Sequence, residues 1–166
     1  MQPLWAPWRM AYVGAGKKEG CIFCDKLNQT DLRAQLILAR TAHSVVMLNK
    51  YPYNNGHLLL APKRHEKQLS ALPAEEYQDL CAALRGSVEI LSKELNPGGF
   101  NLGMNLGRPA GAGVEDHLHW HVVPRWEGDT NFMPVVGEVR VMPQHLLESY
   151  DRLSPLFKEF PSSKRD

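Results

Sequence analysis

The stretch EDHLHWHVVPRW, residues 115–126, places His117, His119 and His121 at every second position. Apolar residues fill the positions between them and continue after the third histidine. A period of two is the period of a β-strand, so we expect the three imidazoles on one face of a strand and the apolar side chains on the other. A merely solvated face would more often carry threonine, lysine or glutamate, which favours a functional face here.

The spacing along a strand limits what the three histidines can do together. Alternate residues lie about 6.7 Å apart, so the outer pair, His117 and His121, is separated by about 13 Å. Zinc binds histidine nitrogen at about 2.0–2.1 Å. One zinc ion therefore cannot comfortably take all three side chains, and we expect the histidines to divide their roles.

A second set of potential ligands begins with the Cys-x-x-Cys pair Cys21 and Cys24. In a reducing compartment this spacing favours a metal site or a redox pair over a structural disulfide. The redox alternative expects a βαβ pattern, which DKLNQTDLR does not show. His57 and His65 flank the apolar run LLLAP, and two cysteines with two histidines form a standard structural zinc set. The third cysteine, Cys81, lies in an apolar helical stretch and is expected to be a small buried residue.

Hydrophobic periodicity along the chain predicts an α+β domain. Strand patterns occupy residues 33–40, 43–50, 56–64 and 100–107, and the histidine strand follows them. A long amphipathic helix is expected over 73–95, and a shorter helix over about 144–160, where Pro155 can kink it. This order predicts a mainly antiparallel sheet with one long helix and a C-terminal helix.

Length and charge narrow the class of protein. A chain of 166 residues suits a single domain over 1–166, with residues 1–20 as a packing segment and 161–166 as a frayed tail. Lysine plus arginine total 19 against 18 acidic residues, so neither nucleic acid nor a membrane surface is expected as the main partner. The sequence has no signal-peptide pattern and no 18-residue apolar stretch, which predicts a cytoplasmic protein.

The motif His-φ-His-φ-His-φ-φ, with φ apolar, is carried by HLHWHVV at residues 117–123. It resembles the histidine triad superfamily of nucleotide hydrolases and transferases, and the resemblance extends from CIFC through VVMLNKYPYNNGHLLLAPKRH to HLHWHVVPRWEGDTNF. Within the superfamily, LWAPWRMAYV, NLGMNLGRPAG and HVVPRWEGDTNF look most like a bacterial branch that includes diadenosine tetraphosphate phosphorylases. The resemblance implies a histidine triad fold and an enzyme that cleaves dinucleoside polyphosphates by nucleotidyl transfer.

The resemblance also implies roles for individual residues. His119 would be the nucleophile, since a neutral imidazole can attack the α-phosphorus and form a nucleotidyl-histidine. His121 would hydrogen-bond the reacting phosphate or the leaving oxygen, and His57 would complete the imidazole cluster. Asn49 matches a position that binds the ribose hydroxyls in relatives, and a turn residue is the alternative interpretation.

The phosphate would be held by a glycine loop, because the chain contains no P-loop motif. Gly111 and Gly113 can turn backbone N–H groups toward an anion directly before the histidine strand, and Asn105 can add a side-chain donor. Relatives commonly place serine, threonine or glutamine on this approach. This chain has Gly113 and Val114 instead, so a side-chain donor to the phosphate is not expected at these two positions.

The acceptor of the nucleotidyl group can be phosphate or water. The N-terminal LWAPWRM and the later PRWEGDTNF favour phosphate, although many transferases and phosphorylases carry glutamine where this chain has His121. Arg108, Arg125 and Trp126 are the candidates for a second anion site. Two rivals stay open, which are a nucleoside phosphoramidate hydrolase and a nucleotide-binding or zinc-stabilised interaction module with little turnover.

Relatives with the Cys-x-x-Cys pair imply a structural zinc ion and no organic cofactor. The implied ligands are Cys21, Cys24, His65 and His117. The resemblance further implies a homodimer, since histidine triad proteins typically join their sheets across a two-fold axis. The aromatic N-terminal segment is expected to pack on its own domain or across that boundary.

Overall fold

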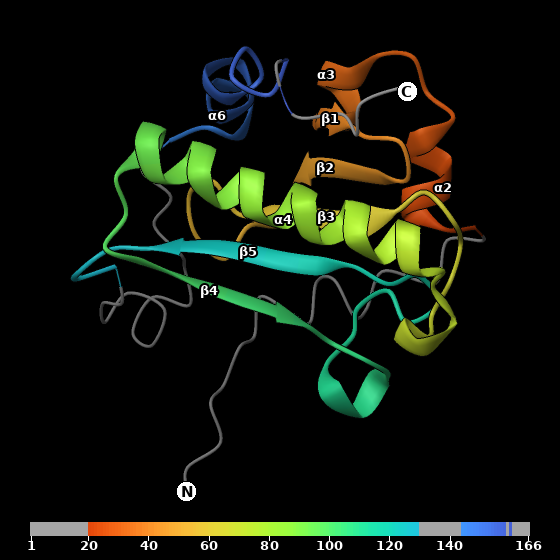
Figure 1. The fold of residues 1–166 in the computed structure, drawn as a ribbon. Coiled ribbons are helices and arrows are strands. Elements are labelled where there is room, and N and C mark those ends of the chain that lie inside the picture. Colours follow the sequence, from red (N-terminus) through yellow and green to blue (C-terminus); the bar gives the residue numbers. More distant parts are fainter. Residues whose placement is uncertain (1–19, 130–143, 159, 161–166) are drawn as a thin grey trace, which may run out of the picture.

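The structure is a computed structural model that describes residues 20–129, 144–158 and 160. Its centre is a five-stranded antiparallel sheet with the order β1-β2-β3-β5-β4 (Figure 1). The strands are β1 Ile37–Arg40, β2 Ser44–Leu48, β3 Leu58–Pro62, β4 Gly99–Met104 and β5 Trp120–Arg125. The helices are α2 Ile22–Leu27, α3 Leu32–Gln35, α4 Ala74–Leu95 and α6 Leu146–Leu153, with short 3-10 turns at η1 Leu69–Ala71 and η2 Arg108–Ala110.

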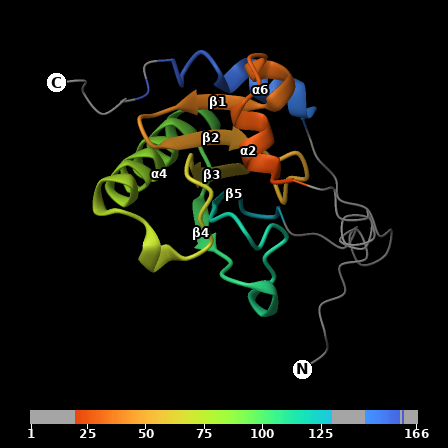
Figure 2. The same ribbon diagram turned by 90° about the vertical axis from the view of Figure 1, so that its right-hand side faces the viewer.

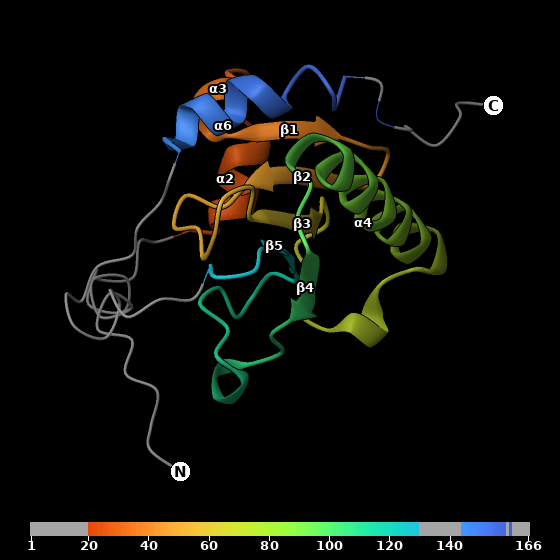
Figure 3. The same ribbon diagram turned by 90° about the vertical axis from the view of Figure 1, so that its left-hand side faces the viewer.

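The predicted α+β class and the antiparallel sheet are confirmed. Helix α4 lies on one side of the sheet and α2 lies on the other (Figures 2 and 3). No helix among the described residues is long and apolar enough to cross a bilayer. The expected packing of residues 1–20 and the frayed tail 161–166 fall almost entirely outside the described residues.

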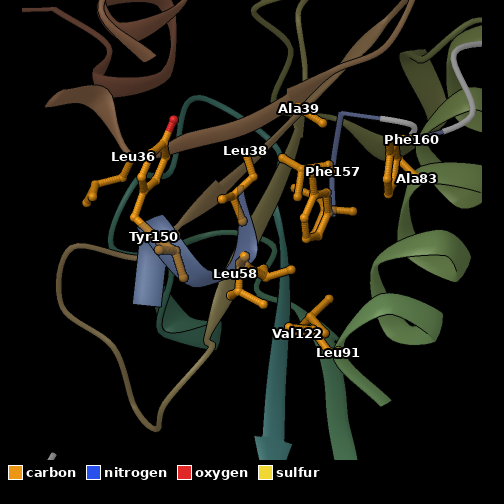
Figure 4. Packing of buried hydrophobic residues seen from close by; sticks show 14 of the residues in the cluster. Leu36, Leu38, Ala39, Leu58, Ala83, Leu91, Val122, Tyr150, Phe157 and Phe160 are labelled. Carbon is orange, nitrogen blue, oxygen red and sulfur yellow. The ribbon is translucent and has the colours of Figure 1, made fainter. Parts of the chain in front are cut away.

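The two faces of the sheet carry two separate hydrophobic clusters, because side chains alternate along each strand. On the α4 side, Val46, Leu58 and Val122 pack with Leu80 and Leu91. The cluster continues under α6, where Figure 4 shows Tyr150 and Phe157 close to Leu38 and Leu58. The smaller cluster on the α2 side contains the following buried residues: Phe23, Ile37, Val45, Met47, Leu59 and Ala61.

The long helix agrees with its prediction to one residue. Pro73 is its N-cap, with Glu75 and Glu76 in the first turn, where acidic residues favour the helix dipole. The helix ends where Asn96 takes the left-handed conformation. Cys81, which is half-buried, is less enclosed than we expected.

Several element boundaries differ from the prediction, three of them with a clear local reason or consequence. Helix α6 ends at Leu153 rather than near 160, because Pro155 cannot continue the helical hydrogen bonds. The short helix α3 occupies the first part of the stretch that we expected to be strand from residue 33. The histidine strand begins only at Trp120, so His117 and His119 precede β5 rather than lying within it.

Candidate active site

Three histidines meet on the α2 side of the sheet. His57 directly precedes β3, and His121 lies on β5 opposite Leu59 of β3. The ring centres of His57 and His121 are 5.1 Å apart, and those of His119 and His121 are 5.0 Å apart. Antiparallel pairing of β3 with β5 therefore brings together residues that are 64 positions apart in the sequence. The predicted imidazole cluster is formed.

The His119 side chain has one nitrogen committed and one available for chemistry. Its Nδ1 lies 2.9 Å from the backbone oxygen of His117. A carbonyl can only accept, so Nδ1 carries the proton and Nε2 keeps its lone pair. The ring is 5% exposed and packs 5.1 Å from the ring of Phe23. Burial lowers the pKa of His119, which favours the neutral form that a nucleophile needs.

The first triad histidine turns away to a second cluster. The ligand atoms of Cys21, Cys24, His65 and His117 all lie within 4.8 Å of one another. Nδ1 of His117 is 3.2 Å from the Cys21 sulfur and 3.7 Å from the Cys24 sulfur, and Nδ1 of His65 is 3.4 Å from the Cys24 sulfur. Tetrahedral zinc with these ligand types separates neighbouring ligand atoms by about 3.3–3.8 Å. The donor set and its spacing therefore fit zinc.

Contacts around the cluster also suit a metal better than a redox pair. Nε2 of His117 donates to the backbone oxygen of Pro62 at 2.8 Å, which leaves Nδ1 as the ligand atom. Burial, followed by the neighbouring Cys21 and Asp25, raises the pKa of the Cys24 thiol to about 11. A redox-active cysteine requires a lowered thiol pKa instead. A bound cation would displace the thiol protons and supply the missing positive charge.

The glycine loop before the triad is a compact turn. Gly107 and Gly111 have φ of 80° and 87°, a conformation that favours glycine. The Asn105 amide donates to the backbone oxygen of Gly111 at 3.3 Å, so part of its hydrogen-bonding capacity stabilises the loop itself. The backbone N–H groups of Ala110, Gly111 and Ala112 also bond within the loop. Among the described contacts, the N–H groups of residues 113 and 114 make no such bond.

Val114 has a packing role that explains its departure from the family's polar residues. It is half-buried and packs against the cluster around Phe23. Phe23 in turn contacts the rings of His117 and His119. An apolar residue here therefore continues the surface that packs against His119, and the sequence pattern alone did not indicate this contact.

Of the other candidate residues, Asn49 lies beside the imidazole cluster and Trp126 lies just after β5. Asn49 approaches Nδ1 of His57 at 3.3 Å, and its side-chain oxygen accepts from the Tyr51 N–H at 2.9 Å. It thus acts as a turn residue beside the imidazole cluster, which leaves its contact with ribose a prediction. Trp126 is half-buried directly after β5, and its backbone N–H donates to Asp129 at 3.0 Å.

The two arginines that we considered for a second anion site are both paired with carboxylates. Arg108 contacts Glu115 at 2.8 Å, and both side chains are exposed. Arg125 makes two bonds of 2.7 Å to Asp129. Each guanidinium charge is therefore balanced by a carboxylate, and the second anion site stays a prediction. Residues that the sequence did not single out, notably Tyr53 and Asn54, contact His57 and the end of β5 instead.

An imidazole cluster in which His119 keeps a lone pair on Nε2, carried on a five-stranded α+β domain, is suited to histidine-dependent transfer or hydrolysis at a nucleotide. The HIT domain family matches residues 31–128, and the chain belongs to this family. AP-4-A phosphorylase of Mycobacterium tuberculosis is 36% identical over 157 residues, which cover 90% of this chain and 80% of that protein. Adenosine 5'-monophosphoramidase hnt1 of Schizosaccharomyces pombe is 35% identical over 105 residues, covering 63% of this chain and 74% of that protein.

Solved structures share the fold. A histidine triad nucleotide-binding protein from Sulfolobus tokodaii is 27% identical with a TM-score of 0.64, covering 84% of this chain and 90% of that one. A Zn-bound histidine triad family protein from Mycobacterium smegmatis is 25% identical with a TM-score of 0.62, covering 87% and 98% of the two chains. The predicted family and fold are confirmed.

Proposed function

We propose that this enzyme transfers a nucleotidyl group from a dinucleoside polyphosphate, with diadenosine tetraphosphate as the preferred substrate, to inorganic phosphate. The observation that carries the proposal is the bond from Nδ1 of His119 to the His117 carbonyl, which leaves Nε2 as a nucleophile. The similarity to AP-4-A phosphorylase over 90% of the chain supports the choice of substrate.

The reaction proceeds in two displacements at the same phosphorus. Nε2 of His119 forms a bond to the α-phosphorus while the bond to the bridging oxygen breaks, and ATP leaves. An oxygen of inorganic phosphate then attacks, the phosphorus–nitrogen bond breaks, and its electron pair returns to Nε2. The products are ADP and ATP. Water in place of phosphate would give AMP and ATP.

Within this proposal the remaining polar residues bind the nucleotide and its phosphate. His121 and His57 complete the catalytic cluster beside His119. Contacts to the nucleotide and its phosphates are proposed for Asn49, Asn105, Gly111, Gly113 and Trp126.

We further propose a structural zinc ion held by Cys21, Cys24, His65 and His117, and a homodimer as the assembled form. The spacing of the four ligand atoms supports the zinc site, as does the zinc bound by the Mycobacterium smegmatis relative. The metal would stay outside the reaction, because His117 faces the cysteines while its carbonyl holds His119.

A nucleoside phosphoramidate hydrolase is the second candidate, favoured by the similarity to the Schizosaccharomyces pombe monophosphoramidase. It would use the same attack by His119, with an amine rather than a nucleotide leaving. The test is a product analysis on a panel of dinucleoside polyphosphates and adenosine phosphoramidate, with and without added phosphate. ADP and ATP formed at a rate that rises with phosphate support the proposal. AMP formed at a rate independent of phosphate contradicts the choice of acceptor.

A further inference from the structure

The loop between β2 and β3, residues 49–57, is tied to the end of β5 by Asn54. Its Nδ2 donates to the backbone oxygen of Pro124 at 3.2 Å and to Oδ2 of Asp129 at 2.7 Å. Its Oδ1 accepts from the N–H of Asn55 at 3.1 Å. The oxygen must face an N–H and the nitrogen must face two acceptors, so the orientation of this amide is fixed.

Asp129 is itself held rigidly, which makes it a firm anchor for the loop. Arg125 donates to both of its oxygens at 2.7 Å, and the N–H of Trp126 donates to Oδ2 at 3.0 Å. Arg125 also donates to Oδ1 of Asn101 at 2.7 Å. A planar guanidinium on a carboxylate has little rotational freedom. Arg125 therefore holds the Asp129 carboxylate in place.

The anchored loop presents one backbone N–H to the imidazole cluster. The N–H of Tyr53 donates to Nδ1 of His57 at 2.9 Å, and the Asn49 amide nitrogen approaches the same atom at 3.3 Å. A backbone N–H can only donate, so Nδ1 of His57 is unprotonated. A neutral His57 then carries its proton on Nε2. A charged His57 would place a second hydrogen against the Tyr53 N–H, which this geometry does not accommodate.

The tautomer of His57 dictates that of His121. Nε2 of His57 lies 2.9 Å from Nδ1 of His121, and Nε2 is the protonated atom. Nδ1 of His121 must therefore accept, and neutral His121 keeps its own proton on Nε2. The third triad histidine thus enters the reaction as a hydrogen-bond donor at Nε2 rather than as a base.

We propose that Asn54 is a positioning residue that sets the protonation pattern of the active site. By fixing the 49–57 loop to Pro124 and Asp129, it holds the Tyr53 N–H on His57, and His57 in turn holds His121 as an Nε2–H donor. The chain of contacts is Asp129, Asn54, the Tyr53 backbone, His57 and His121.

The tautomers of His57 and His121 also affect whether phosphate or water accepts the nucleotidyl group. This consequence rests on the proposed function. Water that attacks the nucleotidyl-histidine must lose a proton, which requires a base near the phosphorus. Nε2 of His121 is already protonated and cannot take it. Inorganic phosphate attacks through an oxygen that is already ionised, and the phosphorus–nitrogen electron pair returns to His119. The Nε2–H tautomer of His121 therefore favours phosphate over water as the acceptor. No residue has to keep water out of the site for this preference to arise.

The tautomers can be measured without substrate. Nitrogen-15 NMR of the zinc-loaded full chain distinguishes protonated from unprotonated imidazole nitrogens, with His57→Gln and His121→Gln spectra for assignment. We expect both histidines as the Nε2–H form in the wild type. A protonated Nδ1 on either histidine would overturn the proposal directly, whatever the substrate of the enzyme proves to be.

The test variant is Asn54→Asp, and Asn101→Ala is its matched control. Asn54→Asp keeps the acceptor for the Asn55 N–H but places a carboxylate against Asp129 and the Pro124 oxygen. We expect it to release the loop and give mixed tautomers at His57 and His121. Asn101→Ala removes a partner of Arg125 but leaves both Asn54 contacts, so we expect wild-type spectra. Asn54→Ser tests the same contact with a smaller change if the aspartate variant does not fold.

The second readout is the ratio of AMP to ADP formed from diadenosine tetraphosphate at fixed phosphate. A general base contributes about 10²–10⁴-fold, so a changed tautomer in about a tenth of the molecules should raise the ratio of AMP to ADP at least tenfold. The ratio does not depend on how much active enzyme is present. An unchanged spectrum and ratio in folded Asn54→Asp refutes the positioning role. AMP alone from the wild type, with the expected tautomers, refutes the phosphate acceptor and leaves the positioning role standing.

Discussion

Two backbone carbonyls determine what the histidines of this site can do. The Pro62 oxygen accepts from Nε2 of His117, and the His117 oxygen accepts from Nδ1 of His119. The first contact directs His117 toward the cysteines through Nδ1, and the second leaves the lone pair of His119 on Nε2. Neighbouring residues of one motif therefore have different tasks because the backbone fixes a different nitrogen in each.

Replacing His119 with alanine or glycine should abolish turnover while the fold and nucleotide binding persist. The substitution removes the attacking nitrogen but leaves the pocket, so we expect turnover to fall by at least about 10³-fold. Steady-state product formation and nucleotide titration measure the two properties separately. His121→Ala is the comparison and should be milder, since it removes a hydrogen-bond donor. Retention of about a tenth of the activity by His119→Ala would rule out the covalent route.

At the scale of single residues, the sequence identified the histidines of the site but not the side chains that contact them. The alternating motif correctly predicted that His119 and His121 lie side by side, although only His121 belongs to β5. The contact of His57 with His121, and that of Asn54 with Asp129, depend on how β3 and β5 meet. Such contacts join distant segments, and a single sequence carries no local signal for them.

At the scale of elements, the short helix α2 places Cys21 and Cys24 beside His65 and His117. We expect close to one zinc per chain in the purified protein, by elemental analysis. A Cys21→Ser, Cys24→Ser variant should lose the metal and melt several degrees lower, because metal bound only to the folded state stabilises it. Cys81→Ser is the matched control and should keep both zinc and stability. Metal-free wild-type protein, or equal melting of the double variant, would contradict the site.

The segment after β3 is tied to α4 by one ion pair. Arg64 bonds Glu76 at 2.6 Å, and this contact lowers the Glu76 pKa below its ordinary 4.5. The Glu76 side chain is 8% exposed, while that of Arg64 is 52% exposed. A lowered carboxyl pKa stabilises the fold above the ordinary value, and this stabilisation is lost as the pH falls through the folded pKa.

Glu76→Gln should therefore lower the free energy of unfolding by about 1–3 kcal/mol near neutral pH. Chemical denaturation of both proteins across pH 3–8 measures the difference. It should stay constant above about pH 5 and shrink as the pH falls below 4.5, because the wild-type carboxylate becomes protonated. Glu75→Gln, on the exposed side of the same turn, is the control and should change little. A difference that grew toward low pH would show that another group dominates.

The sequence predicted α4 to one residue because its amphipathic period extends over 22 residues. It overextended the C-terminal helix, since Leu156 and Phe160 continue the apolar pattern past Pro155 without helical structure. Phe160 is still buried, 9% exposed, and stacks on Phe157. Hydrophobic spacing correctly predicts burial in α4 and at Phe160 beyond Pro155. A helix forms only where the backbone hydrogen bonds continue without interruption, and Pro155 interrupts them.

At the scale of the whole molecule, β1 and β4 form the two edges of the sheet among the described strands, and β4 is the more exposed of the two. Strand β4 pairs with β5 on one side only. Leu102 on this strand is 46% exposed, and Leu106 just beyond it is 49% exposed. An unpaired edge with exposed apolar residues is a site for association with another chain, and a two-fold axis is the most frequent symmetry for such a contact.

We therefore expect a homodimer through β4, with a mass about twice the 18.7 kDa of one chain by light scattering at micromolar concentration. Leu102→Glu places a charge on this edge and should shift the equilibrium to monomer. Leu156→Glu is the matched control, because Leu156 is also exposed, at 41%, but lies beyond α6 and away from β4. A monomeric wild type would contradict the dimer, and equal effects of the two substitutions would exclude β4 as its interface.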